Sequence, residues 1–399
     1  MVTDGEFADS DVQRARRDTP GVANRVHLNN AGAALMPAVV VQTLIEHVER
    51  EAAIGGYEAH AEAADRVEGV YDSLARLVGG HRDEIAVADS ATLAWQRLFY
   101  SLPLSAGDRI LTTTAEFASN YVSYLQAMRT KGVTVETIPD DASGALDPAA
   151  LESMIDERVK LISITWVPTN GGLRNPAAAV GRIARRHGIP YLLDACQAVG
   201  QMPIDVEALG CTMLTATGRK FLRAPRGTGF LYVAQDFLRD LEPAFIDLYG
   251  APYSAPGGYQ LRPDARRFET WETNYSTRLA LGAAAEYAMS WGPEQIERRC
   301  TQLAEQLRTG LQQLSGVTVR DLGEHQSAII TFSHDAVPAQ QVKEALARSG
   351  INASVTPPTS TPLDAAARNL PDLVRLSPHY YNTTEEIAVA LRALEGTTA

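Results

Sequence analysis

LISITWVPTNGGLRNPAAAVGRIARRHGIPYLLDAC, residues 161–196, decides the fold class of this chain. The runs LISITWV and YLLDAC are short and apolar, which is typical of buried strands in a parallel sheet. Between them, AAAVGRIARRHG repeats apolar residues at the spacing of one helix face. A strand, a helix and a second strand in this order predict a βαβ unit with parallel strands.

The same alternation extends from about residue 80 to residue 235. EIAVADS, RILTTTAEF and GTGFLYV predict further strands, and ATLAWQRLFYSL and NYVSYLQAMRT predict helices. This pattern predicts an α/β domain whose parallel sheet is covered by helices on both faces.

The chain reads differently after about residue 260. A long helical stretch precedes SAIITFS and VRLSPHYYN, and Thr383 and Glu386 fit a capping box that opens a last helix. We therefore predict a smaller α+β domain there. The expected limits are an N-terminal segment at 1–30, a large domain at 31–258 and a small domain at 259–399.

Composition excludes several classes of partner. The chain has 399 residues, 45% of them hydrophobic, and a net charge of -12. An acidic chain of this kind does not favour nucleic acid or an anionic membrane as a partner. There is no apolar signal core at the N-terminus, so we expect a cytoplasmic protein. Cys196, Cys211 and Cys300 form no metal-ligand spacing, and we expect reduced thiols and no metal site.

Residues that end the predicted strands are the first candidates for a ligand site, because ligands of open α/β sheets bind beyond the carboxyl ends of the strands. A helix N-terminus there can hold a phosphate, Phe117 can stack on a planar ligand, and Asp194 is costly to bury without a cationic partner. Taken alone, the helix start is more typical of an ordinary cap and Phe117 of core packing, a turn explains Thr169 and Asn170 equally well, and Asp194 is the sharper functional signal. The candidates are Ser90, Ala91, Thr92, Glu116, Phe117, Thr169, Asn170, Asp194 and Gln197.

The stretch TATGRKFLRAPRGTGFLYV, residues 215–233, adds one lysine to these positions. Lys220 has Arg219, Arg223 and Arg226 nearby, and like charges make an amine easier to deprotonate. A neutral amine is what Schiff-base chemistry requires. A solvated basic loop is the alternative.

Taken together, the positions describe one cofactor, pyridoxal 5′-phosphate. It needs an anion site, a ring stack, a donor to the ring oxygen, a carboxylate on the ring nitrogen and a lysine that holds the aldehyde. Asp194 and Lys220 supply the last two.

The order of these motifs resembles the fold type I, class V pyridoxal phosphate enzymes, which include cysteine desulfurases, isopenicillin epimerase-like proteins and carbon–sulfur lyases. The resemblance runs from HLNNAG at 27–32 to HYYNTTEEI at 379–387. It implies a large domain with a mostly parallel, seven-stranded sheet and a smaller α+β C-terminal domain. It also implies a homodimer with the active site at the subunit interface.

The resemblance further implies residue roles. Asp194 pairs with the ring nitrogen, Gln197 bonds the ring oxygen, and Lys220 forms the Schiff base and transfers protons. Thr169 or Asn170 meets the ring oxygen as well, and Phe117 stacks on the ring. Ala91, Thr92, Thr217 and Arg219 bind the phosphate. Arg375 binds the α-carboxylate of the substrate, and Asn30 and Tyr57 are further candidates on the substrate side.

Three departures from the family pattern stand out, and the first two narrow the reaction. Phe117 stands where cysteine desulfurases carry a histidine, so it can stack but cannot move protons. INASVTPPTSTPLDAAARNLPDLVR, residues 351–375, contains no cysteine, although desulfurases carry their nucleophilic cysteine there. Trp271 and Glu272 replace a glycine-threonine pair that delivers a phosphate contact from the neighbouring subunit.

Lys220 is then the one strong acid-base candidate, which favours β-elimination from a cysteine S-conjugate to give a thiol, pyruvate and ammonia. GGYEAHAEA at 55–63 and SPHYYNT look most like actinobacterial carbon–sulfur lyases of ergothioneine-type and lincosamide-type secondary metabolism. The alternatives are a sister enzyme that decarboxylates and oxidatively deaminates, epimerises or transaminates the substrate, and a non-catalytic scaffold that keeps the fold.

Overall fold

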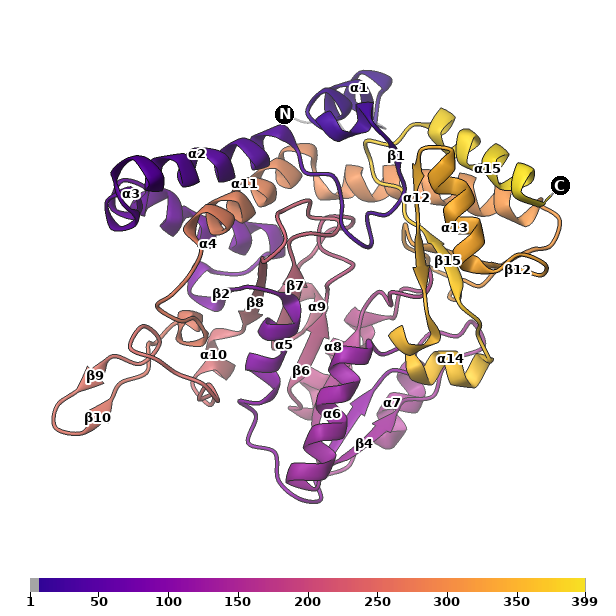
Figure 1. Cartoon of the computed structure of the whole chain (residues 1–399). Coiled ribbons are helices and arrows are strands. Elements are labelled where there is room, and N and C mark those ends of the chain that lie inside the picture. Colours follow the sequence, from indigo (N-terminus) through magenta and orange to yellow (C-terminus); the bar gives the residue numbers. More distant parts are fainter. Residues whose placement is uncertain (1–6, 399) are drawn as a thin grey trace.

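A seven-stranded sheet with the order β2–β8–β7–β6–β5–β3–β4 forms the centre of the larger domain (Figure 1). The computed structural model describes residues 7–398. β8 runs antiparallel to both of its neighbours, and the other six strands run in one direction. This confirms the predicted α/β fold with a mostly parallel sheet. The strands are β2 Ile85–Ala88, β3 Arg109–Thr112, β4 Thr134–Thr137, β5 Val159–Thr165, β6 Tyr191–Asp194, β7 Met213–Thr217 and β8 Gly229–Val233.

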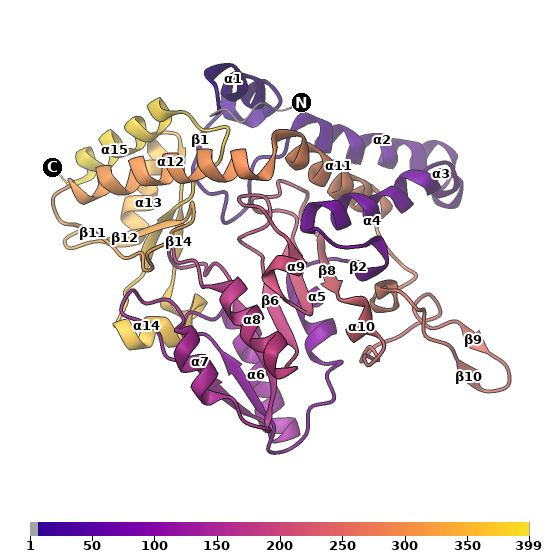
Figure 2. The same ribbon diagram turned by 180° about the vertical axis from the view of Figure 1, so that it is seen from behind.

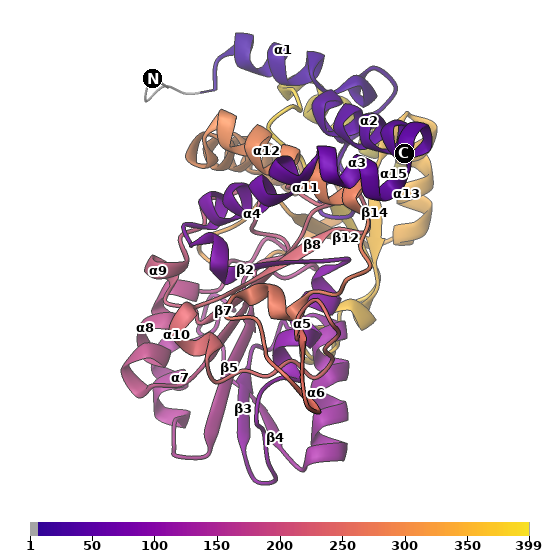
Figure 3. The same ribbon diagram turned by 90° about the vertical axis from the view of Figure 1, so that its left-hand side faces the viewer.

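Helices cover both faces of this sheet, which Figure 3 shows edge-on. Side chains alternate along a strand, so Leu192 joins the core on one face and Leu193 the core on the other. The first face is covered by α5 Ala91–Phe99 and α6 Ala118–Lys131. The second is covered by α4 Ala64–Val78, α7 Pro148–Met154, α8 Ala177–His187, α9 Val206–Leu209 and α11 Tyr275–Trp291 (Figure 2).

The C-terminal part of the chain forms a second sheet with the order β11–β12–β15–β14, in which all pairs are antiparallel. Its last helix, α15, begins with the predicted capping box, because Thr383 N donates to Glu386 Oε2 and Glu386 N donates to Thr383 Oγ1. The elements are β11 Val317–Val319, β12 Ile330–His334, β14 Ser354–Thr356, β15 Leu373–Leu376, α12 Pro293–Gln312, α13 Ala339–Arg348, α14 Pro362–Arg368 and α15 Thr384–Thr398.

The first part of the chain contacts both domains. β1 Val26–His27 pairs in parallel with β13 Ile351–Asn352 of the C-terminal part, and α11 packs against α2 Ala38–Ile54 and α4. The domain limits at residues 30 and 258 stay a prediction. The remaining helices are α1 Asp9–Arg17, α3 Gly56–Glu62 and α10 Gln235–Leu238, with 3-10 turns at Pro20–Ala23, Arg82–Glu84, Ala265–Phe268 and Pro358–Ser360.

A small hairpin, β9 Tyr253–Ser254 and β10 Gly258–Tyr259, projects from the large domain (Figure 1). The long helical stretch expected after residue 276 is divided into α11 and α12 at Gly292, where φ is +79° and proline follows. A backbone in this region ends a helix, so the two halves can pack on different domains.

Candidate active site

The carboxyl ends of the parallel strands bring most of the predicted residues to one edge of the sheet. Thr165 at the end of β5 lies beside Asp194 at the end of β6, and Asp194 lies beside Thr215 of β7. The β7 strand then ends at Thr217, three residues before Lys220. The strand-end rule thus accounts for the position of these residues at one edge of the sheet.

The N-terminus of α5 lies against the start of β8. Ser90 caps this nine-residue helix, since its hydroxyl accepts a hydrogen bond of 3.2 Å from Leu93 N. A Cβ atom added at Gly229 would lie 2.6 Å from Ser90 C and 2.7 Å from Ala91 N, so only glycine permits this approach. Gly229 also pairs with Thr217 across β7 and β8. Thr217 and the free N–H groups expected at the start of α5 thus lie together, as an anion site requires.

Lys220 is buried, with 9% of its surface exposed. Burial is the main cause that lowers the pKa of its amine, and Arg219 and Arg375 act in the same direction. Cys196 and Asp194 also face the amine and oppose this shift. A lowered pKa makes the neutral amine available for Schiff-base formation.

Two of the three arginines near Lys220 in sequence are not among the largest influences on the pKa of its amine. Arg226 is exposed. Arg223 has φ of +64° and turns into the protein, where it donates to Leu35 O at 2.8 Å and to the Tyr380 hydroxyl at 2.6 Å. Of the three arginines, Arg219 is therefore the one among the largest influences on the pKa of Lys220, because the Arg223 side chain is directed into the protein.

Asp194 is buried and receives two hydrogen bonds. Cys196 N donates to its Oδ1 at 2.9 Å, and Asn120 Nδ2 donates to its Oδ2 at 3.0 Å. Gln197 donates through Nε2 to Ala31 O at 3.2 Å and to Thr169 Oγ1 at 3.4 Å. Its buried Oε1 has no partner within the part of the chain that the structure describes. This acceptor is therefore free to bond a cofactor or a water molecule.

Arg375 reaches the same place from β15 of the small domain. Its Nη1 donates to Thr169 O at 3.2 Å and to Thr169 Oγ1. Burial lowers the pKa of this guanidinium to about 10, and the charge of Arg219 acts in the same direction. Its Nε is buried without a partner among the described residues. The planar guanidinium therefore keeps a donor for a carboxylate.

Thr169 and Asn170 differ in their surroundings. The Thr169 hydroxyl lies between Gln197 and Arg375, whereas the Asn170 amide bonds Pro357 O and the Thr356 hydroxyl of the small domain. These contacts favour Thr169 as the residue on the ring side, and the role of Asn170 toward a cofactor stays a prediction.

The three other candidates occupy different surroundings. Phe117 is half-buried at the start of α6, where its N–H donates to Glu116 Oε1 at 2.7 Å. Asn30 is fully buried and both ends of its amide are bonded, Nδ2 to Ser377 O at 2.7 Å and Oδ1 by the Tyr381 hydroxyl at 2.6 Å. Tyr57 is 78% exposed on α3, on the opposite side of the chain from β15 in Figure 1. Within one chain, the structure does not bring Tyr57 to Arg375.

Sequence reasoning missed Asn120, which bonds Asp194. The available signal was its position four residues after Glu116, in the first turn of α6, directly after the strand end that Glu116 follows. It also missed two backbone oxygens. Ala31 O accepts a hydrogen bond from the Gln197 side chain, and Gly32 O accepts one from the Arg219 side chain.

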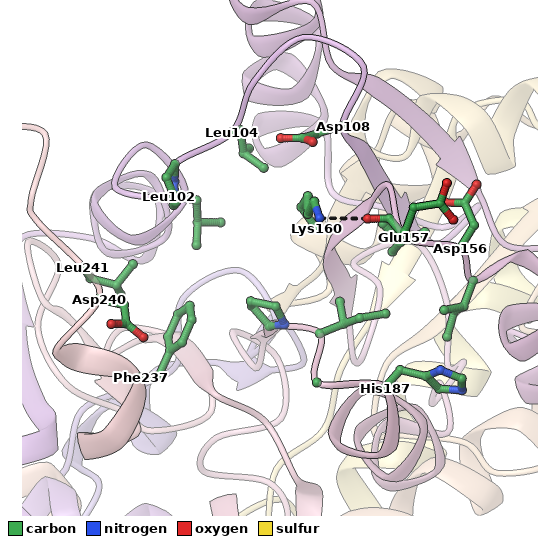
Figure 4. Close-up of a pocket in the computed structure, with 16 residues that line it drawn as sticks. Leu102, Leu104, Asp108, Asp156, Glu157, Lys160, His187, Phe237, Asp240 and Leu241 are labelled. Atoms are coloured by element: carbon green, nitrogen blue, oxygen red, sulfur yellow. Dashed lines mark hydrogen bonds between the residues drawn. The ribbon is translucent and has the colours of Figure 1, made fainter.

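A large cavity lies elsewhere, at the amino ends of the strands (Figure 4). It has a volume of about 670 Å³, with apolar side chains such as Leu104 and Phe237 and the charged groups Asp108, Glu157 and Lys160 around it. The predicted site residues are all outside its lining. It is therefore separate from the candidate active site.

The residues at the carboxyl edge fit pyridoxal phosphate. A helix N-terminus and Arg219 suit its phosphate, the Asp194 carboxylate suits the ring nitrogen, the unpartnered Gln197 Oε1 suits a polar ring substituent, and buried Lys220 suits the aldehyde. The fold and this donor set define a pyridoxal phosphate-dependent enzyme of fold type I.

A family model for aminotransferase class-V matches residues 26–389, and the chain belongs to this family, whose members depend on pyridoxal phosphate. A "Probable cysteine desulfurase" from Methanothermobacter thermautotrophicus is 28% identical over 394 residues, which cover 96% of this chain and 97% of that protein.

Solved structures confirm the fold. The apo cysteine desulfurase from Thermococcus onnurineus NA1 has a TM-score of 0.90 at 24% identity, covering 96% of this chain and 97% of that one. The cystine C–S lyase C-DES, in complex with its product cysteine persulfide, has a TM-score of 0.85 at 23% identity. The match covers 94% of this chain and 99% of that one.

Within residues 7–398, each helix is too short or too polar to cross a lipid bilayer.

Proposed function

We propose that this chain is a pyridoxal phosphate-dependent carbon–sulfur β-lyase that acts on a cysteine S-conjugate in the metabolism of sulfur-containing natural products. The observation that carries this proposal is the buried Lys220 amine, whose pKa is lowered and which faces Asp194 and Arg375. The names of the similar proteins, cysteine desulfurases and a cystine C–S lyase, support chemistry at a carbon–sulfur bond.

Each residue has a defined task in this proposal. Bound pyridoxal phosphate supplies an electron sink for the α-carbon of the substrate. Arg375 binds the α-carboxylate through its fork of donors, which holds the α-carbon near Lys220. Lys220 Nζ removes the α-proton and returns a proton to the departing sulfur. With one water, the S-conjugate yields a thiol, pyruvate and ammonia.

The cysteines argue against a persulfide route. Cys196 lies beside Asp194, and burial is the main cause that raises the pKa of its thiol to about 12. Cys211 and Cys300 are buried, with thiol pKa values also raised to about 12 by burial. A desulfurase needs a thiolate that reaches the substrate sulfur, and neutral thiols in these places do not provide one.

The experiment incubates the purified holoenzyme with a cysteine S-conjugate and measures thiol, pyruvate and ammonia together. Equal amounts of the three support the lyase. Carbon dioxide without pyruvate indicates the decarboxylating sister reaction, α-proton exchange without cleavage indicates an epimerase, and sulfane sulfur on the protein indicates a desulfurase; each of these outcomes refutes the proposed reaction.

Lys220→Ala should abolish turnover and borohydride trapping of the cofactor, because Lys220 is the one lysine within residues 7–398 that is buried at this edge of the sheet. Lys160→Ala is the matched control, since Lys160 is exposed at the opposite edge of the sheet. A Lys220→Ala enzyme with wild-type turnover would refute the covalent role.

We also propose a homodimer in the cytoplasm. Large apolar side chains that a single chain leaves exposed support the dimer: Phe245 is 82%, Leu248 63% and Trp271 53% exposed. Light scattering after size exclusion should give a mass of about twice 43.1 kDa; a monomer would refute the dimer.

A further inference from the structure

Glu116 is a buried carboxylate whose hydrogen-bond partners are neutral groups from two strands, β3 and β5, and from α6 with its N-cap. Only 1% of its surface is exposed. Its Oε2 accepts from Thr112 Oγ1 at 2.7 Å on β3 and from the Tyr124 hydroxyl at 3.4 Å on α6. Its Oε1 accepts from Phe117 N and from Thr165 Oγ1 on β5, the register neighbour of Asp194 on β6.

Asn120 connects this carboxylate to Asp194. The single nitrogen Nδ2 donates at 3.0 Å to Glu116 Oε1 and at 3.0 Å to Asp194 Oδ2. An amide nitrogen has two protons, so both are used. The amide can point one proton at Asp194 only while the other is held by Glu116.

Titratable groups face Glu116 from two elements: Asp194 from β6 and Tyr124 from α6. The hydroxyl and amide donors around it carry no charge. Burial is the main cause that raises the pKa of Glu116 to about 7, and the negative charge of Asp194 adds to this. The charge of Glu116 therefore changes within the working range of a cytoplasmic protein.

We propose that Glu116 and Asn120 are positioning residues that orient the Asp194 carboxylate toward the cofactor ring nitrogen, and that ionised Glu116 strengthens the contact. The inference rests on the proposed role of Asp194. Asn120 fixes the direction of Oδ2, and the second negative charge behind Asp194 stabilises a protonated ring nitrogen. Because Glu116 loses its charge at low pH, this contribution is present above pH 7 and absent well below it.

The test measures the dissociation constant of pyridoxal phosphate for the apoprotein at pH 6 and pH 8.5. Glu116→Gln keeps the shape and the acceptor for Asn120 but carries no charge. Its dissociation constant should equal the wild-type value at pH 6 and exceed it about fivefold or more at pH 8.5. At each pH we compare the ratio of the variant's dissociation constant to the wild-type value. Groups that titrate in the same way in both proteins, including the cofactor itself, do not change this ratio. A purely structural role would not make this ratio depend on pH.

Asn120→Leu removes the bridge and should weaken cofactor binding about tenfold or more at both pH values. Glu84→Gln is the matched control, because Glu84 is also a buried glutamate that accepts backbone N–H bonds, from His81 and Gln235, and it should leave the ratio at about one. If Asn120→Leu does not fold, the pH dependence of the Glu116→Gln ratio still tests the inference.

Asp194→Ala separates this inference from the proposed function. If Asp194→Ala weakens cofactor binding while the Glu116→Gln ratio stays at one across pH, the inference is overturned and the site assignment survives. If Asp194→Ala leaves the dissociation constant unchanged, the role of Asp194 itself is wrong, and both the site assignment and the inference fail.

Discussion

Gly229→Ala tests whether the start of α5 binds the cofactor phosphate. The added methyl carbon would lie 2.6 Å from Ser90 C, 2.7 Å from Ala91 N and 2.9 Å from Ala216 O, whereas ordinary contact begins at 3.4 Å. All three atoms are backbone atoms of packed elements and cannot rotate away. The start of α5 must therefore retreat by about 0.8 Å, the difference between these two distances.

This displacement decides the expected size of the effect. An N–H donor at about 2.9 Å from a phosphate oxygen would move to about 3.7 Å, beyond hydrogen-bond range. Loss of one bond to a charged group costs about 1.5–3 kcal/mol, so the dissociation constant of the cofactor should rise about ten- to a hundredfold. Overpacking should also lower the free energy of unfolding by about 1–3 kcal/mol.

The assay titrates the apoprotein with pyridoxal phosphate and follows cofactor absorbance, together with thermal unfolding of the apoprotein. Gly69→Ala is the control, because Gly69 lies within α4 and nothing lies within 4 Å of its added Cβ. It should leave binding unchanged and raise stability by up to about 1 kcal/mol. If folded Gly229→Ala protein binds the cofactor with wild-type affinity, the phosphate does not lie at the start of α5.

Two further predictions follow from the burial of charged groups. Arg375→Ala should raise KM for the amino-acid substrate with a smaller change in kcat, because the guanidinium binds the carboxylate without transferring protons; an unchanged KM would remove its assigned role. The free energy of unfolding of Glu116→Gln, relative to that of the wild type, should rise by about 1 kcal/mol between pH 6 and pH 8. The full effect of a pKa raised from 4.5 to about 7 is about 3 kcal/mol. The sign follows because ionising Glu116 costs free energy only in the folded protein. Urea denaturation of the apoprotein at the two pH values measures it, and a pH-independent difference would contradict the buried, titrating carboxylate.

The buried strands could be predicted from the sequence because burial on both faces leaves a nearly continuous apolar run. LISITWV and YLLDAC became β5 and β6 for this reason. β4 was missed, since this edge strand has the sequence TVET and its side chains are exposed or half-exposed. An edge strand needs few apolar residues, so the pattern that reveals central strands is absent there.

The site was predictable where one residue ends one strand, and was not where side chains from several elements meet. Asp194 and Lys220 follow directly from strand ends. Asn120 on α6 contacts Asp194 at the end of β6 only in the folded chain, since the two residues are 74 positions apart in sequence. Arg223 is close to Lys220 in sequence, but its left-handed backbone conformation directs its side chain away from the lysine.

The placement of proton donors limits the reactions that the site can perform. Phe117 contributes no titratable group at the start of α6, and the Cys196 thiol stays neutral with its pKa near 12. The pKa of Glu116 lies near 7, but both of its oxygens are occupied by donors inside the protein. In the proposed lyase, Lys220 is thus left as the group that takes a proton from the α-carbon and gives one to sulfur. A single base of this kind suits elimination, in which one proton leaves carbon and one reaches the leaving group, better than a reaction that needs a separate acid on the far side of the substrate.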